Sequence, residues 1–184
     1  CSSVISEAIF PAVYDCFWCG HIQIKSDTFG SNLNKYYEGI EDDIYLSNSI
    51  AKKSTFERAF NNIEKYLPKG SVLRFLDVGS YYGVFLQEIK VAGYYGIGIE
   101  PSLHASEYSR ASLGLSVITG TLEESINKLN SEQSFDVITS WDVLEHVESP
   151  RDFLSVINTL LNSGGIFVFS TICIDSTIAK FLGR

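Results

Sequence analysis

Two short stretches of this chain combine glycines with a carboxylate in a way that could bind a nucleoside. The stretch FLDVGSYYG contains Asp77, Gly79 and Gly83, and the stretch GIGIE ends in Glu100. Glycine lets a backbone approach a ligand closely, and a helix that begins after such a turn directs free N–H groups toward a bound anion. A carboxylate about 20 residues after the first glycine can accept hydrogen bonds from both ribose hydroxyls. The two stretches therefore predict a nucleoside-binding crevice.

Two other interpretations of these stretches stay open. A nicotinamide or flavin dinucleotide would require the pattern G-x-G-x-x-G. When this pattern is aligned on Gly79, Tyr81 stands at its second glycine and Val84 at its third, so the dinucleotide interpretation is the weaker one. Glu100, for its part, could be a helix cap or a surface acid before a helix that starts at Ser102.

A third segment, ITGTLEES, could complete the crevice. Thr121 and Glu124 have the spacing of a capping box at a helix N-terminus. The same strand-to-helix turn would leave backbone N–H groups that could contact an adenine edge, and Thr121 and Leu122 are the candidates for this contact.

A fourth segment, TSWDVLEHV, places possible catalytic groups just after an apolar run. The pKa of histidine lies near neutrality, so His146 could act as a general base, and Asp142 is the second choice. The alternative is that Glu145 and His146 serve turn and packing contacts.

These segments need a scaffold of alternating strands and helices. Apolar runs predict strands at 72–78, 95–99, 115–119, 135–140 and 166–171. Amphipathic segments predict helices at 82–92, 102–113, 122–129, 150–161 and 176–182, after a helical stripe from 50 to 67. This alternation predicts an α/β fold, a Rossmann-like doubly wound parallel sheet with strand order 3-2-1-4-5. Its carboxyl edge would bring the candidate residues together.

Composition limits the classes of function. The chain has 184 residues, of which 45% are hydrophobic, and this suffices for one domain and a small appendage. Its net charge of -8 argues against a nucleic-acid partner, because phosphate binding needs clustered positive charge. No apolar run reaches membrane-spanning length, and the N-terminus lacks the pattern of a signal peptide. We therefore expect a cytoplasmic protein without a membrane partner.

The segments LDVGSYYGVFL, GIGIEPS, GTLEES, FDVITSWDVLEHVESP and GGIFVFST resemble, in order and spacing, the motifs of class I S-adenosylmethionine (SAM)-dependent methyltransferases. The resemblance covers residues 70–172 and is greatest to the group that includes ubiquinone-biosynthesis and sugar methyltransferases. It implies SAM as cofactor and a small-molecule methyl acceptor. A non-catalytic SAM-binding module and, less favoured, a nicotinamide-dependent oxidoreductase remain as alternatives.

The resemblance also implies roles for individual residues. The turn after Asp77 would line the methionine part of SAM, Glu100 would hold the ribose, and Ser140 and Trp141 would offer main-chain contacts near the amino group. The complete implied set is Asp77, Gly79, Ser80, Tyr81, Gly83, Glu100, Pro101, Thr121, Leu122, Ser140 and Trp141. Tyr81 departs from the family, which usually has a glycine there, so we expect it to cover the pocket or to alter affinity.

The N-terminal cysteines resemble part of a second known structure. The stretch YDCFWCG, with Cys16 and Cys19, is similar to half of a zinc ribbon that precedes some methyltransferases, and Cys1 could be a third ligand. A cysteine pair without metal is the alternative, and Cys173 is expected to be a core residue at a strand end. We thus expect a zinc-ribbon-like segment and linker at 1–46 and a SAM-binding core at 47–184. The family sheet ends in an antiparallel hairpin, so this core is expected to be truncated at its C-terminus.

Overall fold

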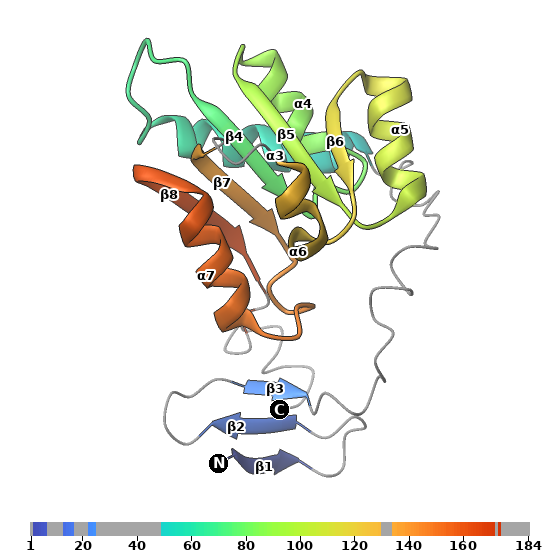
Figure 1. Cartoon of the computed structure of the whole chain (residues 1–184), viewed down its shortest axis with the longest axis vertical. Coiled ribbons are helices and arrows are strands. Elements are labelled where there is room, and N and C mark those ends of the chain that lie inside the picture. The colour runs from blue at the N-terminus through green and yellow to red at the C-terminus, as the bar shows by residue number, and fades with distance from the viewer. Residues whose placement is uncertain are drawn as a thin grey trace. The chain divides into compact units, whose positions relative to one another are not determined.

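The computed structural model describes residues 2–6, 13–16, 22–24, 49–129, 134–171 and 173. The chain divides into two compact units, Cys1–Tyr36 and Tyr37–Arg184. The smaller unit contains an antiparallel sheet with the order β1 (Ser2–Ser6), β2 (Val13–Cys16) and β3 (Ile22–Ile24) (Figure 1). Cys1 and Cys19, two of the three expected zinc ligands, lie outside the described residues, so the zinc-ribbon-like segment stays a prediction.

The larger unit is built on a five-stranded parallel sheet (Figure 1). Its strands are β4 (Arg74–Val78), β5 (Tyr95–Glu100), β6 (Ser116–Thr119), β7 (Phe135–Trp141) and β8 (Leu161–Ser170). The order across the sheet is β6-β5-β4-β7-β8, and every neighbouring pair is parallel. This is the predicted order, so the predicted fold class is confirmed and the carboxyl ends of all five strands lie along one edge.

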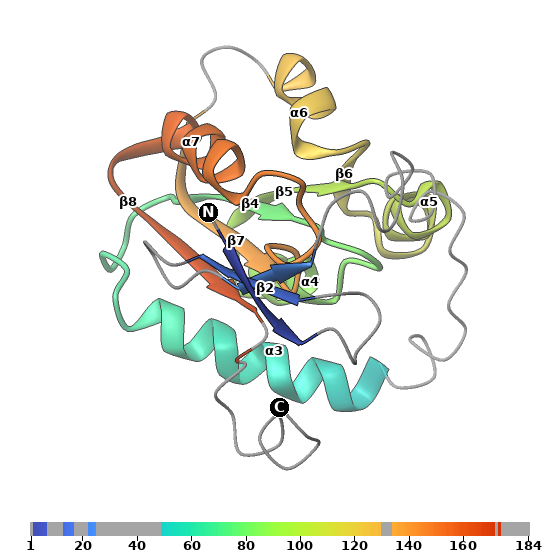
Figure 2. The same cartoon turned by 90° about the horizontal axis from the view of Figure 1, so that it is seen from below.

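Helices lie on both sides of this sheet. They are α3 (Ser49–Glu64), α4 (Val84–Val91), α5 (Leu103–Leu113), α6 (Leu122–Ser125), the short 3-10 helix η3 (Ile126–Lys128) and α7 (Pro150–Leu160). Figure 2 shows α3 and α4 on one side of the sheet and α6 and α7 on the other. The sheet is therefore doubly wound.

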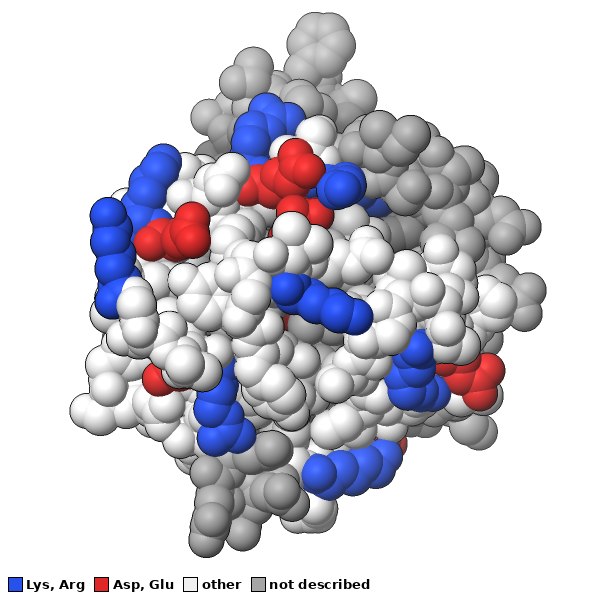
Figure 3. Space-filling view, turned by 90° about the horizontal axis from the view of Figure 1, so that it is seen from above, with Lys and Arg blue, Asp and Glu red and all other residues white. Residues whose placement is uncertain are grey.

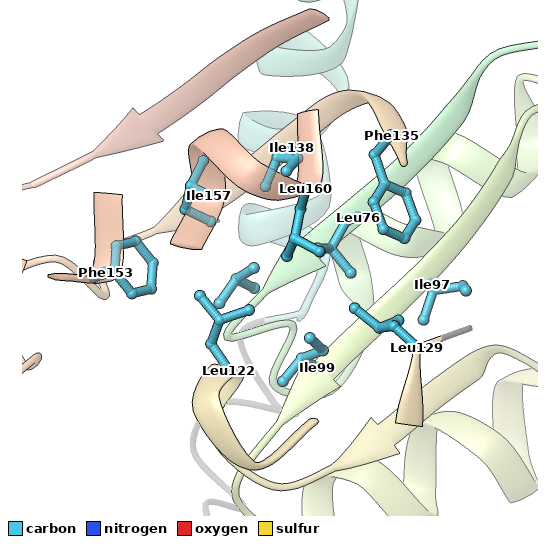
Figure 4. Close-up of a cluster of buried hydrophobic side chains, with 11 residues drawn as sticks. Leu76, Ile97, Ile99, Leu122, Leu129, Phe135, Ile138, Phe153, Ile157 and Leu160 are labelled. Carbon is cyan, nitrogen blue, oxygen red and sulfur yellow. The ribbon is translucent and has the colours of Figure 1, made fainter. Parts of the chain in front are cut away.

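Two clusters of buried apolar side chains join these layers. The cluster under α6 and α7 comprises Leu76, Val78, Ile97, Ile99, Leu122, Leu129, Phe135, Ile138, Phe153, Ile157 and Leu160 (Figure 4). The cluster under α3 and α4 includes Phe60, Ile63, Phe75, Phe85, Ile89 and Val137. Neighbouring residues of β4 enter opposite clusters because side chains alternate along a strand. This burial on both faces explains why the strands have nearly continuous apolar sequences.

The start of β8 differs from the prediction. The sequence predicts a helix that ends at residue 161 and a strand from Ile166, which would leave residues 162–165 as a turn, whereas β8 begins at Leu161, directly after α7. Its pairing with β7 passes from Phe135 opposite Leu161 to Val137 opposite Ile166. The expected turn is thus an irregularity within the strand, where Gly164 has a φ of 81°.

Two further boundaries need correction. Helix α4 begins at Val84 instead of the predicted residue 82, because the turn after β4 continues through Gly83. The expectation that Cys173 is a core residue is wrong: β8 ends at Ser170, and the Cys173 side chain is exposed. The helix predicted at 176–182 lies outside the described residues.

The described part of the chain contains no helix that combines the length and the apolar character needed to cross a membrane. Figure 3 shows one face of the molecule, on which Lys and Arg side chains are distributed around the face and several of them lie beside Asp and Glu side chains. The described residues on this face form no continuous basic stripe of the kind that follows a phosphate backbone.

Candidate functional site

Asp77 is a buried carboxyl near the carboxyl end of β4, the central strand, and its side chain is 1% exposed. Its Oδ1 accepts a hydrogen bond of 2.7 Å from Thr139 Oγ1 on β7, whereas no hydrogen-bond partner contacts its buried Oδ2. Burial raises the pKa of Asp77 from 3.8 to about 7; the bond from Thr139 opposes this rise, and the charge of Glu100 adds to it. A buried oxygen without a partner is a place where a cationic group of a ligand could bind.

The turn that follows β4 is held against β5 by its backbone. The N–H groups of Gly79 and Ser80 donate to Ile99 O at 2.8 and 3.1 Å, and the N–H of Gly83 donates to Ser80 O at 2.8 Å. Gly79, Tyr81 and Gly83 have left-handed φ values of 76°, 48° and 74°. Glycine adopts such values freely, so two of the three left-handed residues in this tight turn are of a type that suits their conformation.

Glu100 ends β5 and is 5% exposed. Its Oε2 accepts a hydrogen bond from the N–H of Tyr81 at 2.7 Å, and its Oε1 accepts one from the N–H of Ser102 at 2.8 Å. Burial raises the pKa of Glu100, and these two backbone bonds oppose the rise. The cap of α5 is Ser102, whose Oγ accepts from the N–H of Ala105. Glu100 is therefore neither the helix cap nor a surface acid.

Two buried hydroxyls accompany the carboxylates. Ser80 Oγ and Ser140 Oγ have no hydrogen-bond partner in the structure, and both residues are at least 95% buried. Ser80 lies against β5, where a Cβ on Gly98 would come within 2.5 Å of Ser80 Oγ. Sequence reasoning missed Gly98 and Thr139. A glycine inside a buried strand indicates that another group approaches its backbone closely, so the sequence contained a signal for Gly98.

The turn after β6 forms the capping box that its sequence predicts. Thr121 Oγ1 accepts from the N–H of Glu124, and Glu124 Oε2 accepts from the N–H of Thr121 at 2.9 Å. Leu122 is buried in the cluster under α6 and α7. The Thr121 N–H, a candidate for an adenine contact, is thus already bonded to Glu124.

The end of β7 carries the remaining cofactor candidates. Ser140 and Trp141 are the last two residues of the strand and pair with Phe169 and Ser170 of β8. The Trp141 ring packs against Phe85 with ring centroids 4.9 Å apart. The Trp141 side chain therefore belongs to the packing between the sheet and α4.

The two candidate bases lie in the loop between β7 and α7, and both are exposed. Asp142 has a left-handed φ of 55°, and its Oδ1 accepts a hydrogen bond of 2.7 Å from Ser170 Oγ. The N–H of His146 donates to Val143 O at 2.8 Å, which closes a turn. Glu145 Oε2 accepts from Thr171 Oγ1 at 3.1 Å. Glu145 and Asp142 thus each accept a hydrogen bond from a hydroxyl at the end of β8 or just after it, and Asp142 and His146 both lie at the edge where the strands end.

Gly79 offers a test of how tightly the turn is packed. A Cβ at Gly79 would overlap Val143 Cγ2, whereas a Cβ at Gly70, which has the nearly equal φ of 77°, would meet nothing within 4 Å. Gly70→Ala should destabilise the protein by about 1–2 kcal/mol through its left-handed φ. Gly79→Ala should lower the free energy of unfolding by about 1–3 kcal/mol more than Gly70→Ala does, because the added methyl group overpacks the turn. Urea unfolding of the two variants measures this difference. Equal losses in the two variants would contradict this packing, and Val143→Ala should recover part of the Gly79→Ala loss.

The larger unit is similar to known methyltransferases. Residues 51–182 match the family described as "Methyltransferase domain". The mitochondrial ubiquinone biosynthesis O-methyltransferase of Schizosaccharomyces pombe is 33% identical over 103 residues, which are 54% of this chain and 38% of that protein. The ubiquinone biosynthesis O-methyltransferase of Colwellia psychrerythraea is 26% identical over 113 residues, 60% of this chain and 45% of that protein. The chain spans less than half of the length of these relatives.

Solved structures show the same fold. An S-adenosylmethionine-dependent methyltransferase from Mesorhizobium loti is 29% identical, with a TM-score of 0.50, over 60% of this chain and 52% of that one. A SAM-dependent methyltransferase from Thermotoga maritima, described as a possible histamine N-methyltransferase, is 21% identical, with a TM-score of 0.56, over 81% of this chain and 62% of that one. Together with a family match that spans well over half of the sequence, the parallel sheet and its glycine turn lead to one conclusion: the chain belongs to the methyltransferase domain family.

Proposed function

We propose that this chain is the SAM-binding part of a methyltransferase that transfers a methyl group to a small molecule. The observation that carries the proposal is the pair of buried carboxyls at the ends of neighbouring strands. Asp77 keeps one oxygen without a partner, and Glu100 is oriented by two backbone N–H groups.

The residues of this crevice suit the chemical groups of SAM. Asp77 Oδ2 would accept from the cofactor ammonium, with the buried hydroxyls of Ser80 and Ser140 beside the same strand ends. Each oxygen of Glu100 accepts one N–H, and a carboxylate oxygen has two acceptor sites. Glu100 therefore retains capacity for both hydroxyls of a ribose.

The protein's own contribution to the reaction is positioning and proton transfer. When bound, SAM supplies a methyl group that its sulfonium already activates. The chain has to hold the acceptor atom in line with that methyl group, and such alignment accelerates a reaction strongly. The names of the matched relatives, ubiquinone biosynthesis O-methyltransferases, favour a hydroxyl as the acceptor. A hydroxyl must lose its proton, and His146 is the proposed base, with Asp142 as the second candidate.

Titration calorimetry of the chain with SAM and with S-adenosylhomocysteine tests the proposal. Binding of either compound, with no response to NAD, would support it and would exclude the oxidoreductase alternative. If neither compound binds at millimolar concentration, the proposal fails. Turnover of hydroxyl-bearing acceptors by the protein then separates an enzyme from a non-catalytic SAM-binding module.

His146→Ala should lower the kcat for a hydroxyl acceptor by about 10²–10⁴-fold, because general base catalysis typically contributes that much. Its affinity for S-adenosylhomocysteine should stay unchanged. Asp142→Asn keeps an oxygen that can accept from Ser170 Oγ and serves as the comparison. If the loss appears in Asp142→Asn instead, Asp142 is the base. If neither variant loses activity, no base from this loop is needed.

We also propose a zinc site in the smaller unit, with Cys16, Cys19 and Cys1 as ligands. The support is the register of its sheet: Ser2 pairs with Cys16, which places Cys1 next in sequence to the partner of Cys16. The described residues contain no group of three or more His, Cys, Asp or Glu that could hold a metal ion, so the site depends on residues beyond them. One zinc per chain by elemental analysis would support the site, and a metal-free chain would reject it.

A further inference from the structure

Tyr81 occupies a backbone conformation that its residue type disfavours. It lies between Gly79 and Gly83 in the turn after β4, and all three residues have left-handed φ values. A side chain with a Cβ destabilises this conformation, whereas glycine does not. Tyr81 and Asp142 are the non-glycine residues with positive φ in the described part of the chain, and aspartate tolerates this region better than tyrosine. Strained residues of this kind persist where the surrounding structure holds them.

Contacts of Tyr81 and of its neighbour Tyr82 connect this turn to α5. Ser109 Oγ, on α5, donates to Tyr81 O at 3.2 Å. The Tyr81 ring contacts the ring of Tyr82 edge to face, with centroids 4.6 Å apart. Tyr82 is 1% exposed and packs in turn against His104 and Tyr108 of α5, at 5.9 and 5.4 Å. A row of aromatic rings thus anchors the strained residue to α5.

In this conformation the N–H group of Tyr81 points to Glu100. The Tyr81 N–H donates to Glu100 Oε2 at 2.7 Å, and the Ser102 N–H holds the other oxygen. We propose that Tyr81 is a positioning residue for Glu100: its ring, packed through Tyr82 onto α5, holds the left-handed backbone that directs the Tyr81 N–H to the carboxylate. The phenol itself is not needed for this role. The inference rests on the proposed function, because the role of Glu100 as a ribose ligand belongs to that proposal.

Four substitutions distinguish the effect of the Tyr81 backbone conformation from the effect of its ring. Tyr81→Phe keeps the ring and should bind S-adenosylhomocysteine within about twofold of the unsubstituted chain. Tyr81→Ala removes the ring that offsets the strain and should bind roughly fivefold to tenfold more weakly. Tyr81→Gly and Tyr81→Asn also lack the ring, but both residue types adopt a left-handed φ readily, so they should restore affinity to within about twofold.

A second measurement reports on Glu100 directly. The backbone bond from Tyr81 opposes the rise in the pKa of Glu100. The pKa of Glu100, followed by carboxyl ¹³C NMR without ligand, should therefore rise in Tyr81→Ala and return in Tyr81→Gly. This titration tests the positioning role even if the chain does not bind SAM, so failure of the proposed function and failure of this inference are distinguishable.

Two outcomes would overturn the inference. Equally weak binding by the Ala, Gly and Asn variants would mean that the ring itself contacts the ligand. Unchanged affinity and unchanged Glu100 titration in Tyr81→Ala would mean that the backbone keeps its place without the ring. If Tyr81→Ala does not fold, Ser109→Ala removes the hydrogen bond that Ser109 Oγ donates to Tyr81 O and should raise the pKa of Glu100, and no rise would count against the role.

Discussion

Glu100→Ala should weaken the binding of S-adenosylhomocysteine by roughly 100-fold or more, since a hydrogen bond to a charged group contributes about 1.5–3 kcal/mol. The substitution removes the acceptor for two ribose hydroxyls at once. It also leaves the N–H groups of Tyr81 and Ser102 without the acceptor that now orders them. Calorimetric titration at low temperature, with circular dichroism to confirm the fold, measures this loss.

Glu107→Ala is the matched control, because Glu107 is an exposed acid on the same helix that Ser102 caps. Its affinity should equal that of the unsubstituted chain. The affinity of Glu100→Gln should lie between those of Glu100→Ala and Glu107→Ala. Its amide keeps one acceptor oxygen but turns an NH₂ group toward one of the backbone donors. Unchanged affinity in Glu100→Ala would remove the basis of the proposed function.

The fold could be predicted from the sequence because its signals are local. Apolar runs such as Phe75–Val78 and Ile166–Phe169 identify buried strands, and the turns at Gly79 and Gly114 mark where strands and helices meet. Parallel strands joined by right-handed helical connections then leave few possible orders. The start of β8 could not be found in this way. The composition of residues 162–165 is that of a turn, and they lie within a strand only because the residues on either side of them, Leu161 and Ile166, pair with β7.

The candidate site was predictable in its residue types but not in its contacts. Asp77 and Glu100 stand out because Glu100 ends an apolar strand and Asp77 is the last residue but one of another. Thr139 does not stand out, since its role depends on register: β4 and β7 pair so that Asp77 lies opposite Thr139. The strain at Tyr81 also has no sequence signal beyond the absence of a glycine. Strand register and backbone dihedral angles depend on pairing between residues that are far apart in the sequence, so they cannot be predicted from the spacing of residues.

Asp77→Asn should stabilise the protein above neutral pH. The pKa of Asp77 is raised from 3.8 to about 7 in the folded chain, so between these values the folded state binds more protons than the unfolded state. Stability therefore falls as the pH rises from about 4 to about 7, by up to about 4 kcal/mol in total. The burial of Glu100 raises its pKa as well and acts in the same direction. Asparagine cannot ionise, and its oxygen can still accept from Thr139 Oγ1.

Urea unfolding of Asp77→Asn and of the unsubstituted chain at pH 4, 6 and 8 measures how the difference in their stability depends on pH. The stability of Asp77→Asn relative to the unsubstituted chain should increase with pH, whereas Asp152→Asn, at an exposed position in the first turn of α7, should show no such increase. The same Asp77→Asn variant should bind S-adenosylhomocysteine at least about tenfold more weakly at pH 8, because it lacks the charge that attracts an ammonium group. Greater stability together with weaker binding is the result expected of a carboxyl that serves a ligand. A variant that is less stable at every pH would instead make Asp77 a structural partner of Thr139.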